Sequence, residues 1–166
     1  GLGMVLHTRH QAPGMPADGG TAMAPAVDLE AQALQPGIEV ADRHGWIVIL
    51  HIPRPARLKD PLNLQQMLEI EQRYPNIQLV IAHIGRAYCP EDIGDAFEVL
   101  QASRSMLFDF SANTSAVVIE GALRAFGARR VLFGSDLPIV RMRMRRICEN
   151  GSYINLVPPG LYGDIS

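Results

Sequence analysis

Three residues that could bind a metal ion or transfer protons each follow a short apolar run in the sequence. His51 ends the first run, His83 ends the second and Asp136 ends the third. Imidazole nitrogens and carboxylate oxygens are ligands for divalent metals such as Zn²⁺ and Mn²⁺, and both groups can also move protons. These residue types, if brought together, would serve either purpose.

The apolar runs themselves predict the elements that would bring these residues together. The three runs lie at 46–51, 77–83 and 130–136 and are rich in Val, Ile and Leu without polar alternation, and a further strand is expected at 105–110. Such runs are typical of strands buried on both faces of a parallel sheet. In parallel α/β folds the chemistry gathers at the carboxyl ends of the strands. We therefore expect parallel, neighbouring strands in chain order, with the three side chains in one concave mouth.

Helical patterns alternate with these strands. Asp60 is a good N-cap for a helix that Pro75 ends, Pro90 opens a second helix that reaches Leu100, and a third is expected from about 115 to 126. Alternating strands and helices favour right-handed βαβ units and an α/β fold with the helices outside the sheet.

The amino-terminal region is less regular. Residues 2–6 predict a short strand, and residues 11–26 are rich in Gly, Ala and Pro, which is typical of a loop. Residues 27–44 predict a weak helix that is interrupted at Pro36-Gly37.

The carboxyl-terminal pattern fades after Pro138. Four arginines fall within 141–146, where we expect a solvated face, and residues 152–157 predict a short strand. The tail at 158–166 is expected to be irregular.

Composition excludes several classes of protein. Fifteen basic and seventeen acidic side chains nearly cancel, and aromatic residues make up only 6% of the chain, so nucleic acid is not an expected partner. No apolar stretch is long enough to span a membrane. Cys89 and Cys148 form no metal-binding spacing and indicate no disulfide framework, and Cys89 is expected to be structural. The chain begins without a Met or a secretory signal, as a processed or cut end would, and a cytoplasmic protein is expected.

Taken together, the residues at the strand ends resemble the metal-dependent amidohydrolase superfamily. The stretches Ala82-His83-Ile84-Gly85 and Phe133-Gly134-Ser135-Asp136-Leu137-Pro138, with a His-terminated strand upstream, carry the resemblance over about residues 38–157. The likeness is greatest to the amidohydrolase-2 branch, which includes decarboxylases of aromatic and muconate-type acids as well as hydrolases. The fold that this resemblance implies is a (β/α)₈ barrel.

The resemblance also implies roles for the three residues. His51 would end strand five as a metal ligand. His83 would end strand six and assist proton transfer or substrate binding, in some members metal binding. Asp136 would end strand eight, bind the metal and act as a base toward water. The metal would be a divalent ion, Zn or Mn.

The sequence departs from the family pattern at one point. The family carries a His-x-His pair at the end of strand one, and this chain has no such pair. His7 and His10 are spaced differently, near the expected fourth strand, and the family role is not carried over to them. The loss of two ligands should weaken metal affinity by orders of magnitude.

Two arginines lie three residues beyond a strand-end histidine. Arg54 follows His51 and Arg86 follows His83, so either guanidinium could bind a substrate carboxylate bidentately, although surface arginines are an equally good interpretation. The histidines could instead be core residues bonded to backbone carbonyls, and Asp136 could cap a following helix. Asp109 and Asn113 are expected to cap or shape a loop.

We therefore interpret the chain as part of a (β/α)₈ TIM barrel, from approximately strand four or five to strand eight. Residues 1–35 form an uncertain strand and loop, 36–157 the barrel portion and 158–166 the tail. The expected function is metal-dependent hydrolysis or decarboxylation of a small carboxylated substrate, with little activity from this chain alone. The alternative is a non-catalytic half-barrel that serves as an interaction or self-assembly module. An open sheet has edges that need cover, and association into a homo-oligomer could provide it.

Overall fold

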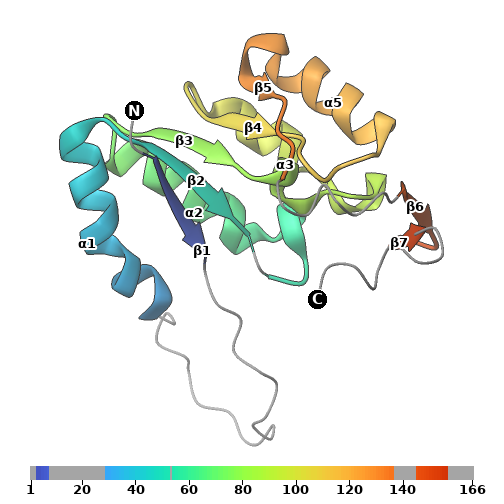
Figure 1. Cartoon of the computed structure of the whole chain (residues 1–166), viewed down its shortest axis with the longest axis horizontal. Helices are drawn as coiled ribbons and strands as arrows, with labels where there is room; N and C mark the ends of the chain where they lie inside the picture. The colour runs from blue at the N-terminus through green and yellow to red at the C-terminus, as the bar shows by residue number, and fades with distance from the viewer. Residues whose placement is uncertain (1–2, 8–28, 53, 137–144, 157–166) are drawn as a thin grey trace, which may run out of the picture.

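A five-stranded parallel sheet forms the centre of the described part of the chain (Figure 1). The structure is a computed structural model, and it describes residues 3–7, 29–52, 54–136 and 145–156. The strands stand side by side in chain order, and each neighbouring pair is parallel. They are β1 (Gly3–His7), β2 (Ile47–His51), β3 (Gln78–Ile81), β4 (Leu107–Asp109) and β5 (Val131–Leu132). The prediction of an α/β fold with parallel neighbouring strands is therefore confirmed.

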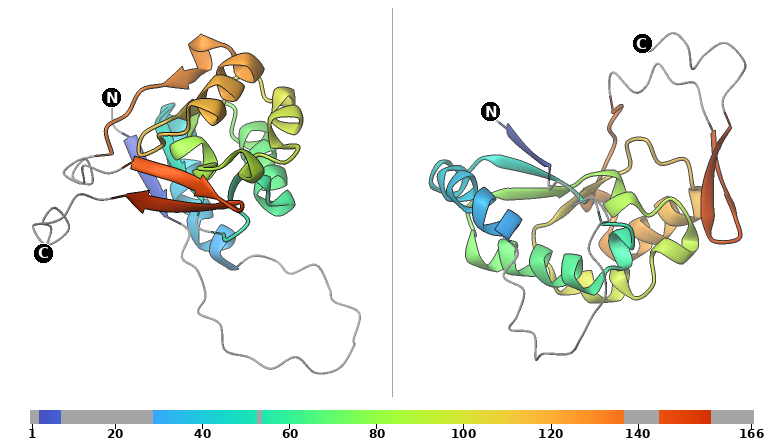
Figure 2. Two further views of the ribbon diagram at one scale, coloured as in Figure 1. Left: turned by 90° about the vertical axis from the view of Figure 1, so that its right-hand side faces the viewer. Right: turned by 90° about the horizontal axis from the view of Figure 1, so that it is seen from below.

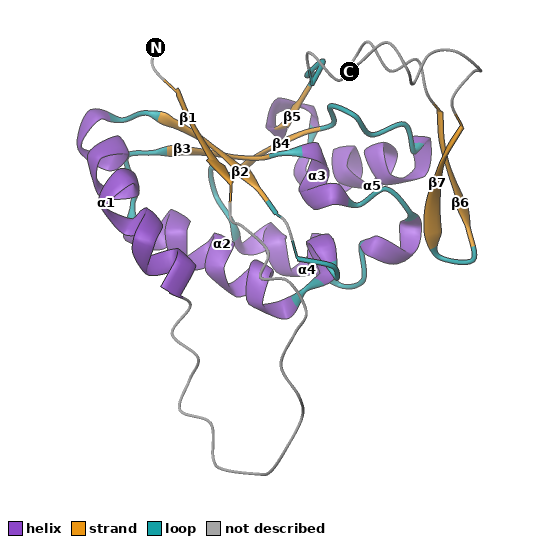
Figure 3. Cartoon of the chain, turned by 60° about the horizontal axis from the view of Figure 1, so that its bottom comes forward, coloured by secondary structure: helices purple, strands orange, loops and turns teal. Residues whose placement is uncertain are grey.

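Helices cover one face of this sheet (Figures 2 and 3). The long ones are α1 (Leu29–His44), α2 (Pro61–Arg73) and α5 (Ala116–Phe126). Short helical turns complete the connections: η1 (Arg57–Lys59), α3 (His83–Arg86), η2 (Pro90–Asp92), α4 (Ala96–Val99), η3 (Leu100–Ala102) and η4 (Ala128–Arg130). As expected for βαβ units, each long helix connects one strand to the next.

The core lies between the sheet and these helices. In β2, Val48 and Leu50 are buried, whereas Ile47 is 46% exposed and Ile49 is half-buried. The expectation that every strand is buried on both faces is thus wrong for β2, because helices cover one of its faces only. Phe108 of β4 stacks on Phe126 of α5, with ring centroids 4.1 Å apart, and fixes this helix against the sheet.

Several predicted elements have different limits in the structure. The helix predicted from Pro90 to Leu100 is divided into η2 and α4, because Gly94 between them adopts a left-handed φ of +52°, and Leu100 already belongs to η3. Conversely, α1 continues through Pro36, where an interruption was predicted. β5 ends at Leu132, four residues before Asp136. The predicted loop at 11–26, Arg141, Arg143 and the tail lie outside the described residues.

The amino-terminal end of β4 is held by Glu71 of α2. Its carboxylate accepts hydrogen bonds from the backbone N–H groups of Ser105 and Met106, both at 2.8 Å, and from the hydroxyls of Ser103 and Ser105. Burial would raise the pKa of Glu71, but these hydrogen bonds outweigh it and hold the pKa below its ordinary value.

A two-stranded antiparallel hairpin stands apart from the parallel sheet, beside α5 (Figure 3). It consists of β6 (Arg145–Glu149) and β7 (Ser152–Leu156). Asn150 and Gly151 both have positive φ, at +51° and +73°, as a two-residue hairpin turn requires. The predicted strand at 152–157 is present as β7, but its antiparallel partner was missed.

A disulfide joins this hairpin to the body of the fold. Cys89, buried directly after the α3 turn, bonds to Cys148 of β6, with their Cα atoms 5.6 Å apart. The expectation of no disulfide is therefore wrong, because the hairpin folds back across a sequence separation of 59 residues. Among the described helices, none has the length and apolar character needed to cross a bilayer.

We expect Cys148→Ser to lower the free energy of unfolding by about 2–4 kcal/mol, because the disulfide restricts the unfolded chain. Chemical denaturation under oxidising conditions measures this loss. A reductant should bring the wild-type protein to the stability of the variant. Identical stabilities of the variant and the oxidised wild-type protein would contradict the expectation.

We expect Glu71→Gln to destabilise the fold at neutral pH, with a difference that shrinks as pH falls below about 4.5, the ordinary pKa of glutamate. The sign follows from the lowered pKa, because the folded state favours the carboxylate. Glu71 therefore stabilises the fold above the pKa that it has in the unfolded chain, and this stabilisation is lost as the pH falls through the lower pKa of the folded state. Denaturation at several pH values tests this. Glu120→Gln is the control, because its exposed ion pair with Arg124 should contribute little. A difference that does not depend on pH would count against the assignment.

Candidate active site

His51 and His83 meet at the carboxyl-terminal edge of the sheet. His51 is the last residue of β2, and His83 follows the neighbouring strand β3 by two residues. Their rings make an edge-to-face contact with centroids 5.3 Å apart. His83 is buried, with 8% of its surface exposed, whereas His51 is half-buried. The structure thus brings two of the three candidate residues together, and their catalytic roles stay predictions.

The backbone that presents His83 is a left-handed turn. His83, Ile84, Gly85 and Arg86 all have φ between +49° and +61°. Only Gly adopts such values freely, and each other residue costs roughly 1–2 kcal/mol there. A branched residue such as Ile84 is an outlier in this region. Strained backbone of this kind persists only where the surrounding structure holds it, and it is concentrated at functional sites.

Gly85 allows this turn to lie close to the core. A Cβ atom at Gly85 would lie 2.5 Å from Cδ1 of Leu58 and 3.3 Å from Cδ1 of Ile52. Leu58 is fully buried in η1 and Ile52 directly follows His51. The glycine therefore seats the His83 turn against the segment that leaves β2.

The imidazole ring of His83 is held from β4 and the loop after it. Its Nδ1 lies 2.9 Å from both the carbonyl oxygen and the Oγ of Ser111. The backbone N–H of His83 donates to Oδ1 of Asp109 at 3.2 Å. The same Oδ1 accepts hydrogen bonds from the backbone N–H of Ser111, at 2.9 Å, and from its hydroxyl. Asp109 thus binds both the His83 turn and the residue that contacts the His83 ring.

Asp109 and Asn113 were predicted to cap or shape a loop, and the structure confirms this. Asn113 accepts from the N–H of Ser115 and donates to the carbonyl of Ala87 at 2.7 Å. The contacts of Asp109 and Ser111 with His83 were missed. The signal was present, because Asp109 ends a strand of the same sheet and should therefore share the edge with His83.

Asp136 lies beyond the end of β5, half-buried and with φ of +53°. The segment before it passes close to the loop after β4, since a Cβ atom at Gly134 would lie 3.0 Å from Cβ of Ser111. Within the described ranges, however, no three His, Cys, Asp or Glu side chains are arranged to hold a metal ion. The described residues thus do not form a three-ligand metal site by themselves, and the assignment of His51 and Asp136 as metal ligands stays a prediction.

The two candidate arginines have different surroundings. Arg54 donates from Nε to Asp60 at 2.7 Å. Asp60 is the N-cap of α2, as predicted, and although burial would raise its pKa, the bonds from Arg54, Leu62 and Asn63 lower it. Arg86 donates to the carbonyl of Ile52 at 3.3 Å, one residue beyond His51. Arg86 is therefore the one placed beside the histidine pair.

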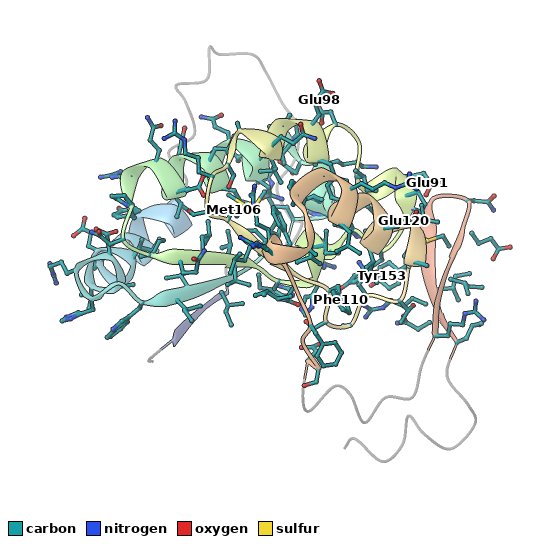
Figure 4. All side chains as sticks on the ribbon, turned by 90° about the horizontal axis from the view of Figure 1, so that it is seen from above. Glu91, Glu98, Met106, Phe110, Glu120 and Tyr153 are labelled. Carbon is teal, nitrogen blue, oxygen red and sulfur yellow. A yellow bond between two sulfur atoms is a disulfide. The ribbon has the colours of Figure 1, made fainter. Side chains whose placement is uncertain are left out.

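A group of tyrosines and arginines anchors the β6–β7 hairpin to the body of the fold. Tyr153 points from β7 toward the body of the fold and meets Tyr88 edge to face, with ring centroids 5.0 Å apart (Figure 4). The Arg146 guanidinium lies 4.0 Å from the centroid of the Tyr88 ring, and Arg57 lies 4.7 Å from that of Tyr153. Burial raises the pKa of Tyr88, and this effect outweighs the positive charges of Arg146 and Arg86, which act to lower it. The expected solvated face is thus wrong for Arg146, which is half-buried in this group.

Comparison with known proteins now places this geometry in a family. The family profile described as "Amidohydrolase" matches residues 11–146. Because that match spans most of the sequence, the chain belongs to the amidohydrolase family, and the resemblance found in the sequence is confirmed. Among curated proteins no match is found.

Two solved structures are similar to the chain. One is "Amidohydrolase 2 from Bifidobacterium longum subsp. infantis", with 18% sequence identity and a TM-score of 0.47 over 63% of this chain and 40% of that one. The other is the "Crystal structure of a putative amidohydrolase from Staphylococcus aureus", with 15% identity and a TM-score of 0.44 over 61% of this chain and 46% of that one. The chain therefore matches less than half of the length of either structure.

We expect Gly85→Ala to destabilise the fold more than Gly45→Ala. Both glycines have a similar left-handed φ, +59° and +62°, so both variants incur roughly 1–2 kcal/mol of backbone strain. Only Gly85→Ala adds a clash with Leu58, and such overpacking costs about 1–3 kcal/mol more. Denaturant titration of the two variants checks the difference. Equal losses would mean that close packing of the His83 turn contributes nothing.

Proposed function

We propose that this chain forms the carboxyl-terminal part of an amidohydrolase-type (β/α)₈ barrel, from about strand four or five to strand eight. The proposed reaction is hydrolysis of a small carboxylated substrate, with decarboxylation as the second candidate. The family match at residues 11–146 supports the reaction class. The edge-to-face contact of His51 and His83 at the carboxyl-terminal edge of the sheet is the observation that carries the site.

A divalent metal, Zn or Mn, is part of the proposal. His51 and Asp136 are the proposed ligands from this chain, and both residue types suit these ions. The described residues alone do not gather three ligands, and the sequence has no His-x-His pair. The remaining ligands would have to come from outside the described residues, and we derive no reaction step through the metal.

The proposed roles of the protein side chains follow from their positions. His83, buried and fixed by Ser111, would transfer a proton, and Asp136 would act as a base. Arg86 is proposed as the substrate-carboxylate ligand in preference to Arg54, because its guanidinium donates to the carbonyl of Ile52, one residue beyond His51.

Other parts of the proposal rest on less. The domain limits at 1–35, 36–157 and 158–166 stay proposals. Self-association is supported by the sheet, because β1 and β5 have one neighbouring strand each among the described residues. The family match does not favour the alternative of a non-catalytic module.

The disulfide weighs against the predicted cytoplasmic location, since such bonds persist in oxidising compartments.

We expect the isolated chain to bind zinc weakly and to show little or no turnover of amide or carboxylated substrates with added Zn²⁺ or Mn²⁺. His51→Ala should weaken zinc binding by at least about tenfold, because even partners outside the ligand shell contribute this much. His44→Ala is the matched control, because His44 is exposed and stacks on Trp46. Titration calorimetry and product assays give both readouts.

Two results would change this proposal. Equal zinc affinity in the wild-type protein and both variants would remove His51 from the site. Strong activity that is abolished by His51→Ala would show that the chain, or a second copy of it, already completes the ligand set.

A further inference from the structure

The contacts of His83 determine which ring nitrogen carries a proton when the ring is neutral. A neutral imidazole has one N–H donor and one nitrogen that accepts. Nδ1 of His83 lies 2.9 Å from the carbonyl oxygen of Ser111. A carbonyl oxygen has no hydrogen to donate, so this contact is a hydrogen bond only if Nδ1 carries the proton.

The second contact of Nδ1 has the same requirement. Oγ of Ser111 also lies 2.9 Å from Nδ1, and the hydroxyl hydrogen could in principle point toward the ring. It is used elsewhere, because this hydroxyl donates to Oδ1 of Asp109. Oγ can therefore only accept from Nδ1. Both oxygens around Nδ1 are acceptors, and the Asp109 carboxylate is what makes the hydroxyl one.

The burial of this group makes the arrangement selective. His83 is 8% exposed, Ser111 is 6% exposed, and the Asp109 side chain is 13% exposed. A buried acceptor or donor left without a partner costs about 1–3 kcal/mol. The opposite tautomer would leave the Nδ1 lone pair facing two acceptor oxygens, so the Nδ1–H tautomer should dominate.

We propose that Asp109 and Ser111 are positioning residues that hold neutral His83 in the Nδ1–H tautomer and so leave the lone pair on Nε2. That nitrogen is then the one able to accept a proton from a substrate or to face a metal ion. Asp109 also binds the backbone N–H of His83, so one carboxylate sets both the position of the left-handed turn and the chemistry of its ring. The use of Nε2 in catalysis rests on the proposed function, whereas the tautomer does not.

The test is a ring-nitrogen NMR spectrum of the ¹⁵N-labelled full chain at about pH 8, above the ordinary histidine pKa of about 6.5. His83→Gln identifies the signals of His83. In the wild-type protein, we expect the Nδ1–H form to exceed the Nε2–H form about fivefold or more, which one hydrogen bond of typical net strength supplies. A dominant Nε2–H form in the wild-type protein would overturn the proposal, and this result requires no variant.

Variants of Asp109 separate positioning from simple stability. In Asp109→Ala the Ser111 hydroxyl loses its acceptor and becomes free to donate to Nδ1, so the Nε2–H form should rise to a substantial fraction. Asp109→Asn should restore the wild-type tautomer, because its amide oxygen still accepts. Asp42→Ala is the matched control, since Asp42 also accepts two hydrogen bonds, from the N–H and the side-chain amide of Asn76.

The remaining outcomes are also decisive. If Asp109→Ala leaves the tautomer ratio unchanged while the protein stays folded, Asp109 is not a positioning residue. If Asp42→Ala changes the ratio as much as Asp109→Ala, the effect is general destabilisation and the proposal fails. The spectra need neither substrate nor metal, so an absence of turnover would count against the proposed function and leave this inference standing.

Discussion

The carboxylate of Asp109 is the interaction on which the carboxyl-terminal edge of the sheet depends. Its Oδ1 accepts from the backbone of His83 and from both the backbone and the hydroxyl of Ser111. The left-handed turn at 83–86 is unfavourable by itself, because three of its four residues are not glycine. This carboxylate therefore holds the turn directly and, through Ser111, the His83 ring beside His51.

A second carboxylate does the same work at the other end of β4. This strand has only three residues, so its pairing with β3 and β5 is short. Glu71 accepts hydrogen bonds from N–H groups and hydroxyls of the segment that enters β4, and Asp109 accepts them from the segment that leaves β4. Arg130 adds bonds to the carbonyls of Ser103 and Met106 at the entering end. Side chains thus fix β4 at both ends. Glu71 and Arg130 hold the end where the chain enters, and Asp109, its own last residue, holds the end where the chain leaves.

The sequence was informative where periodicity and strand-end residues decide the structure. The parallel order of the strands, the N-cap at Asp60 and the meeting of His51 with His83 could all be predicted, because they follow from local patterns and from the geometry of parallel sheets. What could not be predicted depends on contacts across long separations. The Cys89–Cys148 pair has no local signature, whereas Asn150-Gly151 was an overlooked hairpin signal. Arg54 lies at the predicted spacing from His51, but its guanidinium forms an ion pair with Asp60, the N-cap of α2.

The disulfide has a consequence for the connectivity of the molecule. Cys89 and Cys148 close a covalent ring that contains Asp109, Ser111 and Asp136, while His83 lies six residues outside it. If a protease cut the backbone between Cys89 and Asp109, His83 and its positioning residues would belong to different polypeptides. The ring would still hold the two pieces together, so that loss of the backbone link there would not separate His83 from the side chains that orient it.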